Sequence, residues 1–294
     1  MKLLKQYRSA FFWIIIPFIS SCSYSFYSAA CDYPVPGALH KVTNLHPALN
    51  ETSGIIKIDS LYYTFNDSGA EAEVFSFSEH SSIIQKTIIS NATNVDWEAI
   101  AYDGDYFYLA DVGNNFGTRD TLMIYKIPSD GIKHMDPVAS ASEVISFSYN
   151  EEVFKNSTGW YSHDCEAIFS YGDSLYLISK DWVGNSARFY ALPKEPGHYN
   201  IEHRNAYHVD ALITGSDVNL ETKEVAMVGY RNYVPVLIVY SFEEDPSLIK
   251  CGGKVRKYPL RIGAQVEAVC FDENGRIMIT AEKQFYKQAL YTTY

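Results

Sequence analysis

Short apolar segments alternate with polar turns along most of the chain, and the alternation recurs as five copies of one unit. Each copy starts at an acidic residue, continues into a short apolar segment and a polar turn, and reaches a second apolar segment about nine residues after the acid. Short apolar runs bounded by turn residues are typical of β-strands. The acids that begin the five copies are Glu51, Glu98, Glu166, Asp217 and Glu267.

The same units contain signals for a third and a fourth strand. The third strand carries an aromatic residue at a recurring distance from the acid, namely Phe77, Tyr125, Tyr190, Tyr240 and Tyr291. Fourth strands are expected in four copies, at residues 83–89, 144–147, 206–209 and 255–260. The fifth copy has no room for one, so we expect residues 39–42, which precede the first copy, to supply it.

These repeats predict an all-β fold. A four-stranded sheet with apolar residues on both faces cannot bury both alone, whereas five such sheets in a ring bury one another. We therefore expect a β-propeller, most simply of five four-stranded blades, closed by an N-terminal strand that pairs into the last blade. Successive acids are about 50 residues apart, but Glu98 and Glu166 are 68 apart, which indicates an insertion in the second repeat. A β-sandwich or a looser barrel is the alternative.

The N-terminal segment has the features of a secretory signal. A basic start precedes an apolar run at residues 11–19, which is too short to span a bilayer. The residues that end at Cys22 resemble the lipobox of bacterial lipoproteins, in which the cysteine is lipidated. The rival interpretation is ordinary cleavage after Ala30, which would release a secreted protein.

Three regions follow from this interpretation. We expect residues 1–21 to be a signal peptide, residues 22–36 a tether and residues 37–294 the propeller domain. A lipid at Cys22 would then attach an exported protein to the bacterial cell envelope, at the outer membrane or the periplasmic face.

The composition is acidic, with 35 Asp and Glu against 24 Lys and Arg and a net charge of −11 at pH 7. No nucleic-acid partner is expected, because such binding requires a basic surface. The balance is compatible with bound cations. Cys31 and Cys251 lie outside the predicted strands and are candidates for a disulfide, whereas buried thiols throughout are the equal alternative.

In a propeller of this kind, the acids are expected to converge. The first strand of each blade lines the channel, and the antiparallel second strand ends where the first begins. Carboxylate and amide oxygens are ligands that Ca²⁺ prefers. The candidate Ca²⁺ ligands at this channel mouth are Glu98, Asp111, Asn114, Glu166 and Asp217. The plainer alternative is that such acids accept backbone N–H bonds from neighbouring blades and only hold the ring together.

The second repeat and the segment after it carry further polar and aromatic groups. We expect these to contact a small polar ligand: Asp96, Trp97, Asn115, Arg119 and Trp160. His163 lies beside two acids in the sequence and is a candidate general acid or base, although a hydrogen-bonding loop residue is the commoner role.

The segment Asp96-Trp-Glu-Ala-Ile-Ala followed by Leu109-Ala-Asp-Val-Gly-Asn-Asn and Arg119 resembles a signature of exported, lipid-anchored bacterial propeller proteins. Ala99 departs from that pattern, where an acid is usual. The resemblance implies a propeller fold and export, but no activity. More distantly, the acidic mouth is similar to those of calcium-dependent propeller hydrolases, namely the propeller phytases and the gluconolactonase and paraoxonase group.

Three functions remain open at this stage. The leading one is an exported, lipid-anchored propeller that binds a divalent cation and a small polar ligand or protein partner at its acidic mouth. The second is a calcium-dependent hydrolase of a lactone or phosphoester. The third is a structural interaction scaffold without a metal.

Overall fold

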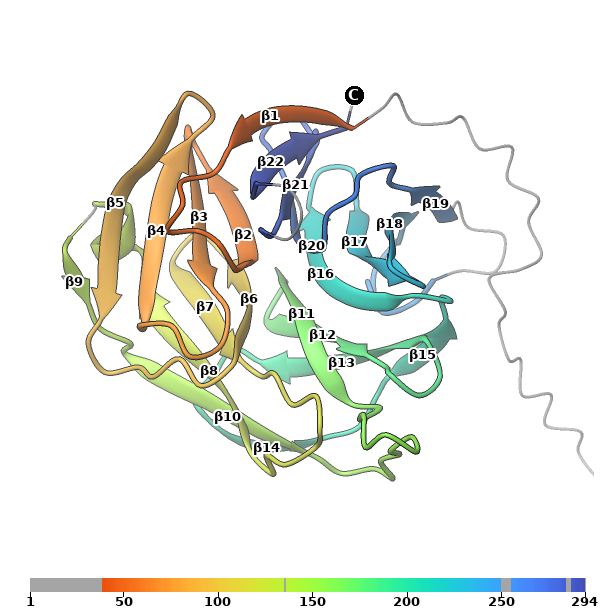
Figure 1. Cartoon of the computed structure of the whole chain (residues 1–294). Helices are drawn as coiled ribbons and strands as arrows, with labels where there is room; N and C mark the ends of the chain where they lie inside the picture. The colour runs from red at the N-terminus through yellow and green to blue at the C-terminus, as the bar shows by residue number, and fades with distance from the viewer. Residues whose placement is uncertain (1–38, 135, 250–254, 284–286, 294) are drawn as a thin grey trace, which may run out of the picture.

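The computed structural model describes residues 39–134, 136–249, 255–283 and 287–293, and these form a five-bladed β-propeller (Figure 1). The predicted signal peptide, the tether, Cys22, Cys31 and Cys251 lie outside the described residues. Cys165 and Cys270 are buried free thiols. Within the described ranges, no helix is long and apolar enough to cross a membrane.

Each blade is one antiparallel sheet built outward from the channel. Blade 1 comprises β2 (Thr52–Ile58), β3 (Leu61–Asn66), β4 (Glu73–Ser78) and β5 (Ser81–Ile89). Blade 2 comprises β6 (Trp97–Tyr102), β7 (Tyr106–Asp111), β8 (Leu122–Pro128) and β10 (Glu143–Tyr149). Blade 3 comprises β11 (Asp164–Tyr171), β12 (Ser174–Lys180), β13 (Ser186–Pro193) and β15 (Asn205–His208).

The last two blades complete the ring. Blade 4 comprises β16 (Leu212–Asn219), β17 (Glu224–Arg231), β18 (Val234–Ser241) and β19 (Val255–Pro259). Blade 5 comprises β20 (Val266–Phe271), β21 (Ile277–Ala281), β22 (Ala289–Thr292) and, on its outer edge, β1 (His40–Asn44). The pairing of β1 with β22 confirms the predicted closure by an N-terminal strand, and joins residues near the two ends of the chain.

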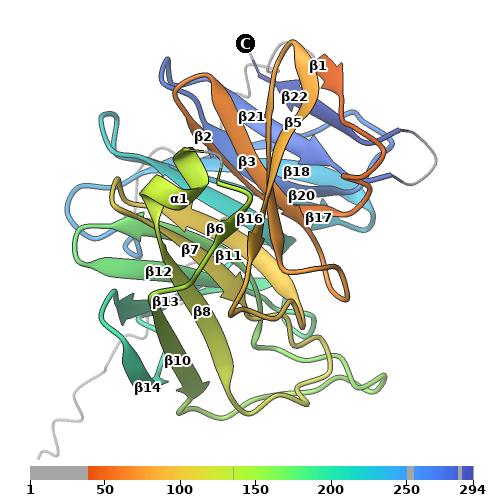
Figure 2. The ribbon, with the colours of Figure 1, turned by 90° about the vertical axis from the view of Figure 1, so that its left-hand side faces the viewer.

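Two short strands were not predicted. β9 (Val138–Ala139) pairs in parallel with β5, and β14 (Gly197–Ile201) pairs in parallel with β10. Each strand follows its partner's blade in sequence and reaches back to it, so each ties two neighbouring blades together. The insertion in the second repeat supplies β9, the short helix α1 (Ser129–Lys133) visible in Figure 2, and the long segment between β10 and β11.

Apolar clusters fill the interfaces between neighbouring blades around the whole ring. One such cluster joins Phe169 of β11 to Ile213 of β16, and another joins Ile55 of β2 to Cys270 of β20. In Figure 1 the inner strands β2, β6, β11, β16 and β20 surround a common centre. Since burial is shared between blades, opening the ring would expose two apolar blade faces.

Every inner strand has a β-bulge near its start, and the bulges define the equivalent positions of the five repeats. These positions are Ser53, Glu98, Glu166, Thr214 and Glu267. Glu51 and Asp217 were therefore wrongly assigned as the acids of repeats one and four. Glu51 is exposed before β2, and Asp217 lies three residues beyond the bulge position of β16.

Blades 1 and 4 carry a hydroxyl followed by glycine where the others carry Glu-Ala. Ser53 Oγ donates to the backbone oxygen of Glu98 at 3.1 Å, and Thr214 Oγ1 donates to that of Val266 at 2.8 Å. Both bonds reach the inner strand of the next blade. A Cβ on Gly54 would lie 2.9 Å from the Ile100 nitrogen, so only glycine permits this approach.

We predict that Gly215→Ala destabilises the protein by about 1–3 kcal/mol, because its new methyl group would lie 2.7 Å from the backbone oxygen of Glu267. Urea unfolding measures the change. Gly131→Ala is the control, since its nearest neighbour is a methyl group at 3.3 Å. Equal stability of the two variants would contradict the tight packing of blade 4 against blade 5.

Candidate functional site

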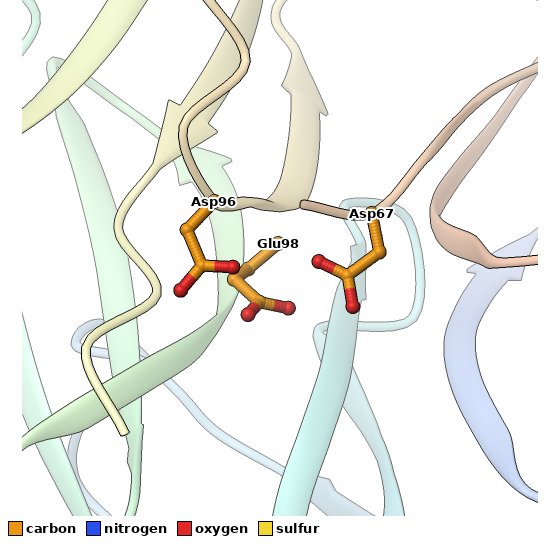
Figure 3. Close-up of side chains that lie close together, drawn as sticks. All are labelled: Asp67, Asp96 and Glu98. Atoms are coloured by element: carbon orange, nitrogen blue, oxygen red, sulfur yellow. The ribbon is translucent and has the colours of Figure 1, made fainter. Parts of the chain in front are cut away.

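Three carboxylates converge at the channel mouth, the end of the channel at which the inner strands begin. Asp67 follows β3, Asp96 precedes β6, and Glu98 occupies the bulge of β6. One oxygen from each lies within 4.8 Å of the others, and Figure 3 shows the three groups pointing toward one another. Asp67 was not among the predicted metal ligands, although its place at the end of a second strand put it on the correct face.

The backbone of Gly113 lies against this carboxylate triad of Asp67, Asp96 and Glu98. A Cβ at Gly113 would lie 2.2 Å from Asp96 Oδ2 and 2.6 Å from Glu98 Oε1. A side chain there would displace both carboxylates. The glycine of the Asp-Val-Gly-Asn-Asn segment is therefore required by the close approach of the loop to the triad.

Burial, and after it the charges of neighbouring carboxylates, raises the pKa of each member of the triad. Burial, followed by the charges of Asp67 and Asp164, raises the pKa of Asp96 to about 6. Burial, followed by the charge of Glu166, raises the pKa of Glu98 well above its ordinary value. Burial also raises the pKa of Asp67. Full ionisation of this group is unfavourable unless a cation is present.

The neighbouring arc of the mouth has its own cation. Lys180 Nζ contacts the two carboxylate oxygens of Glu166 at 2.6 and 2.7 Å. The ammonium also lies 4.8 Å from the ring centre of Trp182 and 5.5 Å from that of Tyr230. Among the described residues, no lysine or arginine forms an ion pair with the carboxylate triad. Within the described part of the chain, Lys180 is paired with Glu166 and Arg119 with Asp111, and neither is paired with the triad.

The loop after β7 is held by its own polar residues. Arg119 forms an ion pair with Asp111 at 2.8 Å and donates to the Gly113 oxygen at 2.9 Å. Asn114 Oδ1 accepts the N–H groups of Thr118 and Arg119 at 2.8 and 3.0 Å. The predicted ligands Asp111, Asn114 and Arg119 are therefore engaged in folding the loop, although Asp111 Oδ2 has no hydrogen-bond partner.

Aromatic side chains border the mouth in a stacked column. Trp160 lies between Phe116 and Trp182, with ring centres 4.8 and 4.2 Å away. Trp182 Nε1 donates to Asn115 Oδ1 at 3.1 Å and to Asp164 Oδ2 at 3.0 Å. Trp160 and Asn115, two of the predicted ligand-binding residues, thus position Trp182, which in turn contacts Lys180.

Trp97, another predicted ligand-binding residue, is completely buried. Its indole nitrogen donates to the Thr93 oxygen at 3.0 Å, and its ring packs against Phe65 and Tyr125. Trp97 therefore packs between blades 1 and 2 and has no surface available to a ligand.

His163 is buried away from the carboxylate triad. Its Nδ1 lies 2.6 Å from Ser162 Oγ, and its Nε2 lies 3.4 Å from Glu151 Oε1. Burial, followed by the charge of Arg188, lowers its pKa to about 4. None of its polar partners or ring contacts belongs to the triad, so the structure does not bring the predicted acid or base to the acidic mouth.

Asp217, one of the predicted metal ligands, is also apart from the triad. Its Oδ2 accepts the N–H of Phe271 from blade 5 at 2.8 Å. Burial raises its pKa to about 7. This is the role foreseen in the plainer alternative, in which an acid holds neighbouring blades together.

Together, the fold and the mouth define a five-bladed β-propeller with an acidic end. No known protein-family model matches the sequence. A search of curated proteins also finds no match.

Solved structures do resemble the chain. A glutaminyl cyclase from Myxococcus xanthus is 11% identical, with a TM-score of 0.52 over 88% of this chain and 97% of that one. The PQQ-bound aldose sugar dehydrogenase from Streptomyces coelicolor is 11% identical, with a TM-score of 0.50 over 88% and 99%. A glucose dehydrogenase is 7% identical, with a TM-score of 0.51 over 88% and 99%. At these identities the likeness shows the propeller fold alone.

We predict that the chelator-treated protein becomes more stable as the pH falls from about 9 toward 5. Burial raises the pKa of Glu282, which follows β21, to about 9, that of Glu267 to about 7 and that of Asp96 to about 6. Stabilisation from each group is complete below its unfolded pKa near 4 and is lost as the pH rises through the folded value. Glu282→Gln should flatten the dependence of the melting temperature on pH, and the exposed Glu221→Gln should not. A wild-type melting temperature that decreases steadily as the pH is lowered from about 9 to 5 would contradict the raised pKa values.

We also predict that Lys180→Met lowers the free energy of unfolding by about 3–5 kcal/mol, because it leaves the buried Glu166 without its counter-charge. Adding Glu166→Gln to that variant should recover most of the loss. Denaturant unfolding of the wild type, both single variants and the double variant gives the coupling energy. Additive effects would show that the two groups do not stabilise each other.

Proposed function

We propose that the acidic mouth binds a divalent cation, Ca²⁺ in preference, through Asp67, Asp96 and Glu98. The spacing of the three carboxylates carries this proposal. Two ligands on opposite sides of a Ca²⁺ ion are about 4.6–5.2 Å apart, since Ca–O distances are about 2.3–2.6 Å. One carboxylate oxygen from each triad residue lies within 4.8 Å of the others, so the three oxygens are close enough to share one ion.

The surroundings of the triad also favour a cation. Lys180 neutralises the neighbouring arc, whereas the triad has raised pKa values and no paired cation of its own within the described part of the chain. A bound ion would relieve the repulsion. The all-oxygen donor set suits Ca²⁺ better than a transition metal.

Three carboxylates leave coordination positions open, because Ca²⁺ takes six to eight oxygens. We propose that water and a small polar ligand, or the polar group of a protein partner, complete the shell. The proposal also retains export and a lipid anchor at Cys22, which follow from the N-terminal sequence. Hydrolysis of a lactone or phosphoester is less well supported, because His163 lies elsewhere. A scaffold without metal would leave the repulsion within the triad to be relieved by protonation alone, since no lysine or arginine of the described residues pairs with it.

Calcium should raise the melting temperature of the chelator-treated protein. A ligand at about 100 times its Kd stabilises the native state by about 2.7 kcal/mol, or roughly 5 °C for a chain of this size. Asp96→Asn and Glu98→Gln should abolish the shift, since each removes a ligand charge, whereas Asp217→Asn and the exposed Glu221→Gln should retain it. The shift should also shrink as the pH falls below about 6, because protons compete at Asp96.

The proposal fails if Ca²⁺, Mg²⁺ and Mn²⁺ all leave the melting temperature unchanged. It also fails if Glu98→Gln retains the full response. Loss of the response in Asp217→Asn would instead favour a metal site that includes the Asp217 carboxylate, as the sequence predicts.

A further inference from the structure

A second pair of acids lies at the channel mouth, where blade 5 meets blade 1. Glu267 occupies the bulge of β20, and Glu282 directly follows β21, which pairs with β20. The two blades are joined at this point, since the Lys283 nitrogen donates to the Asn50 oxygen at 3.1 Å. Burial, followed by the charges of Glu267 and Asp67, raises the pKa of Glu282 to about 9. These carboxylates ionise together only when a cation joins them.

Glu267 has a carboxylate oxygen that is available to such a cation. The residue is 6% exposed, and its Oε1 has no hydrogen-bond partner. Lys180, whose charge acts on Glu267, is already paired with Glu166. Among the residues that the structure describes, no lysine or arginine forms an ion pair with Glu267 or Glu282. Buried acceptors without a donor are rare, so this oxygen points to a ligand that donates.

The spacing of the acids favours an organic cation here over a metal ion. Within the described ranges, the acids close enough together to share a metal ion are Asp67, Asp96 and Glu98. Neither Glu267 nor Glu282 belongs to that group. An ammonium or guanidinium group is larger than a metal ion and donates several hydrogen bonds in different directions. It can therefore pair with carboxylates that are too far apart to ligate one ion.

Exposed apolar side chains surround the remainder of the mouth, on the loops of blades 2, 3 and 4. This apolar rim comprises Phe116, Val153, Phe154, Val183 and Tyr233. Phe116 stacks on Trp160, which stacks on Trp182, so the parts of the rim on blades 2 and 3 are continuous. Tyr233 is 95% exposed at the turn between β17 and β18, with a φ of 65° that bulky residues rarely adopt. Apolar groups gathered at one end of a protein mark an interaction surface.

The chain enters the propeller from the end opposite to the mouth. β1 ends with Asn44 opposite Ala289, and Ala289 pairs with Ala281 at the mouth. His40, the first residue of β1, is therefore at the far end. A lipid at Cys22, as proposed above, would leave the mouth facing away from the membrane. This orientation favours a protein over a lipid surface as the occupant of the apolar rim.

We propose that the mouth docks a protein partner through a lysine or arginine side chain, which pairs with Glu267 and Glu282 while neighbouring apolar residues of the partner pack on the apolar rim. This interaction is separate from cation binding by the triad. Charge complementarity supports the choice of partner, because the chain has a net charge of −11 and these two acids lack a counter-charge of their own. Aromatic residues and arginine are enriched at the centres of protein interfaces.

Calorimetric titration of the Ca²⁺-saturated full-length protein with short synthetic peptides tests this inference. The peptides carry lysine, norleucine or glutamate between leucine and phenylalanine. We expect the lysine peptide to bind about tenfold more tightly than the norleucine peptide, and the glutamate peptide to bind more weakly than both. Glu282→Gln should abolish the preference for lysine, whereas Glu221→Gln, an exposed change at the opposite end of the propeller, should keep it. The double variant Phe116→Ser and Phe154→Ser should weaken the lysine and norleucine peptides alike.

Several results would overturn the inference. These are equal binding of the lysine and norleucine peptides, no binding of either at about 1 mM peptide, and an unchanged preference in Glu282→Gln. Binding of n-butylammonium as tightly as the lysine peptide would indicate a small-amine site instead. Anionic lipid vesicles that bind through Phe116 and Phe154 would assign the rim to a membrane.

A further variant separates this inference from the proposed Ca²⁺ site. Glu98→Gln should lose the Ca²⁺ response and keep the preference for lysine, because Glu98 belongs to the triad. Failure of Ca²⁺ binding alone therefore leaves the docking inference standing, and failure of peptide binding leaves the Ca²⁺ site standing.

Discussion

Ring closure is the constraint on which the rest of the structure depends. Because five inner strands begin around one narrow channel, any charged residue at their bulges is placed close to the others. Three of the five bulge positions are glutamates, and Asp67, Asp96 and Asp164 add charge at the same end. The mouth therefore requires compensation by protonation, by an internal cation or by a bound ion.

The protein divides this compensation between two arcs. In blades 3 and 4, Lys180 pairs with Glu166 and lies between two aromatic rings, which the column from Phe116 to Trp182 supports. In blades 1 and 2, the loop around Gly113 is fixed by its own polar residues. Its backbone lies against the triad, and the guanidinium of Arg119 pairs with Asp111. The asymmetry leaves the triad without a paired lysine or arginine within the described part of the chain, and the proposed cation would supply the missing charge.

The blades were predictable because strand patterns are local, and even the closing strand followed from counting strands in the repeats. The site was less predictable, because successive side chains of a strand point to opposite faces. An error of one residue in the predicted register therefore places a side chain on the wrong face. Asp181 and Lys180 are neighbours at the end of β12, but Asp181 pairs with Arg188 at 2.7 Å, whereas Lys180 pairs with Glu166. The bulges shifted the register again and removed Glu51 and Asp217 from the ring. His163 lies next to Asp164 in the sequence, yet its side chain contacts Ser162 and Glu151 and not the carboxylates of the mouth.

The most direct measurement of the central claim is anomalous diffraction from crystals soaked with Mn²⁺ or a lanthanide as a Ca²⁺ substitute. We expect one strong peak among the carboxylates of Asp67, Asp96 and Glu98, and no peak beside Glu166, where the ammonium group of Lys180 already lies. A mouth without any peak, or a peak at Glu166 with Lys180 displaced, would contradict the division of the mouth into a neutralised arc and a cation-binding arc.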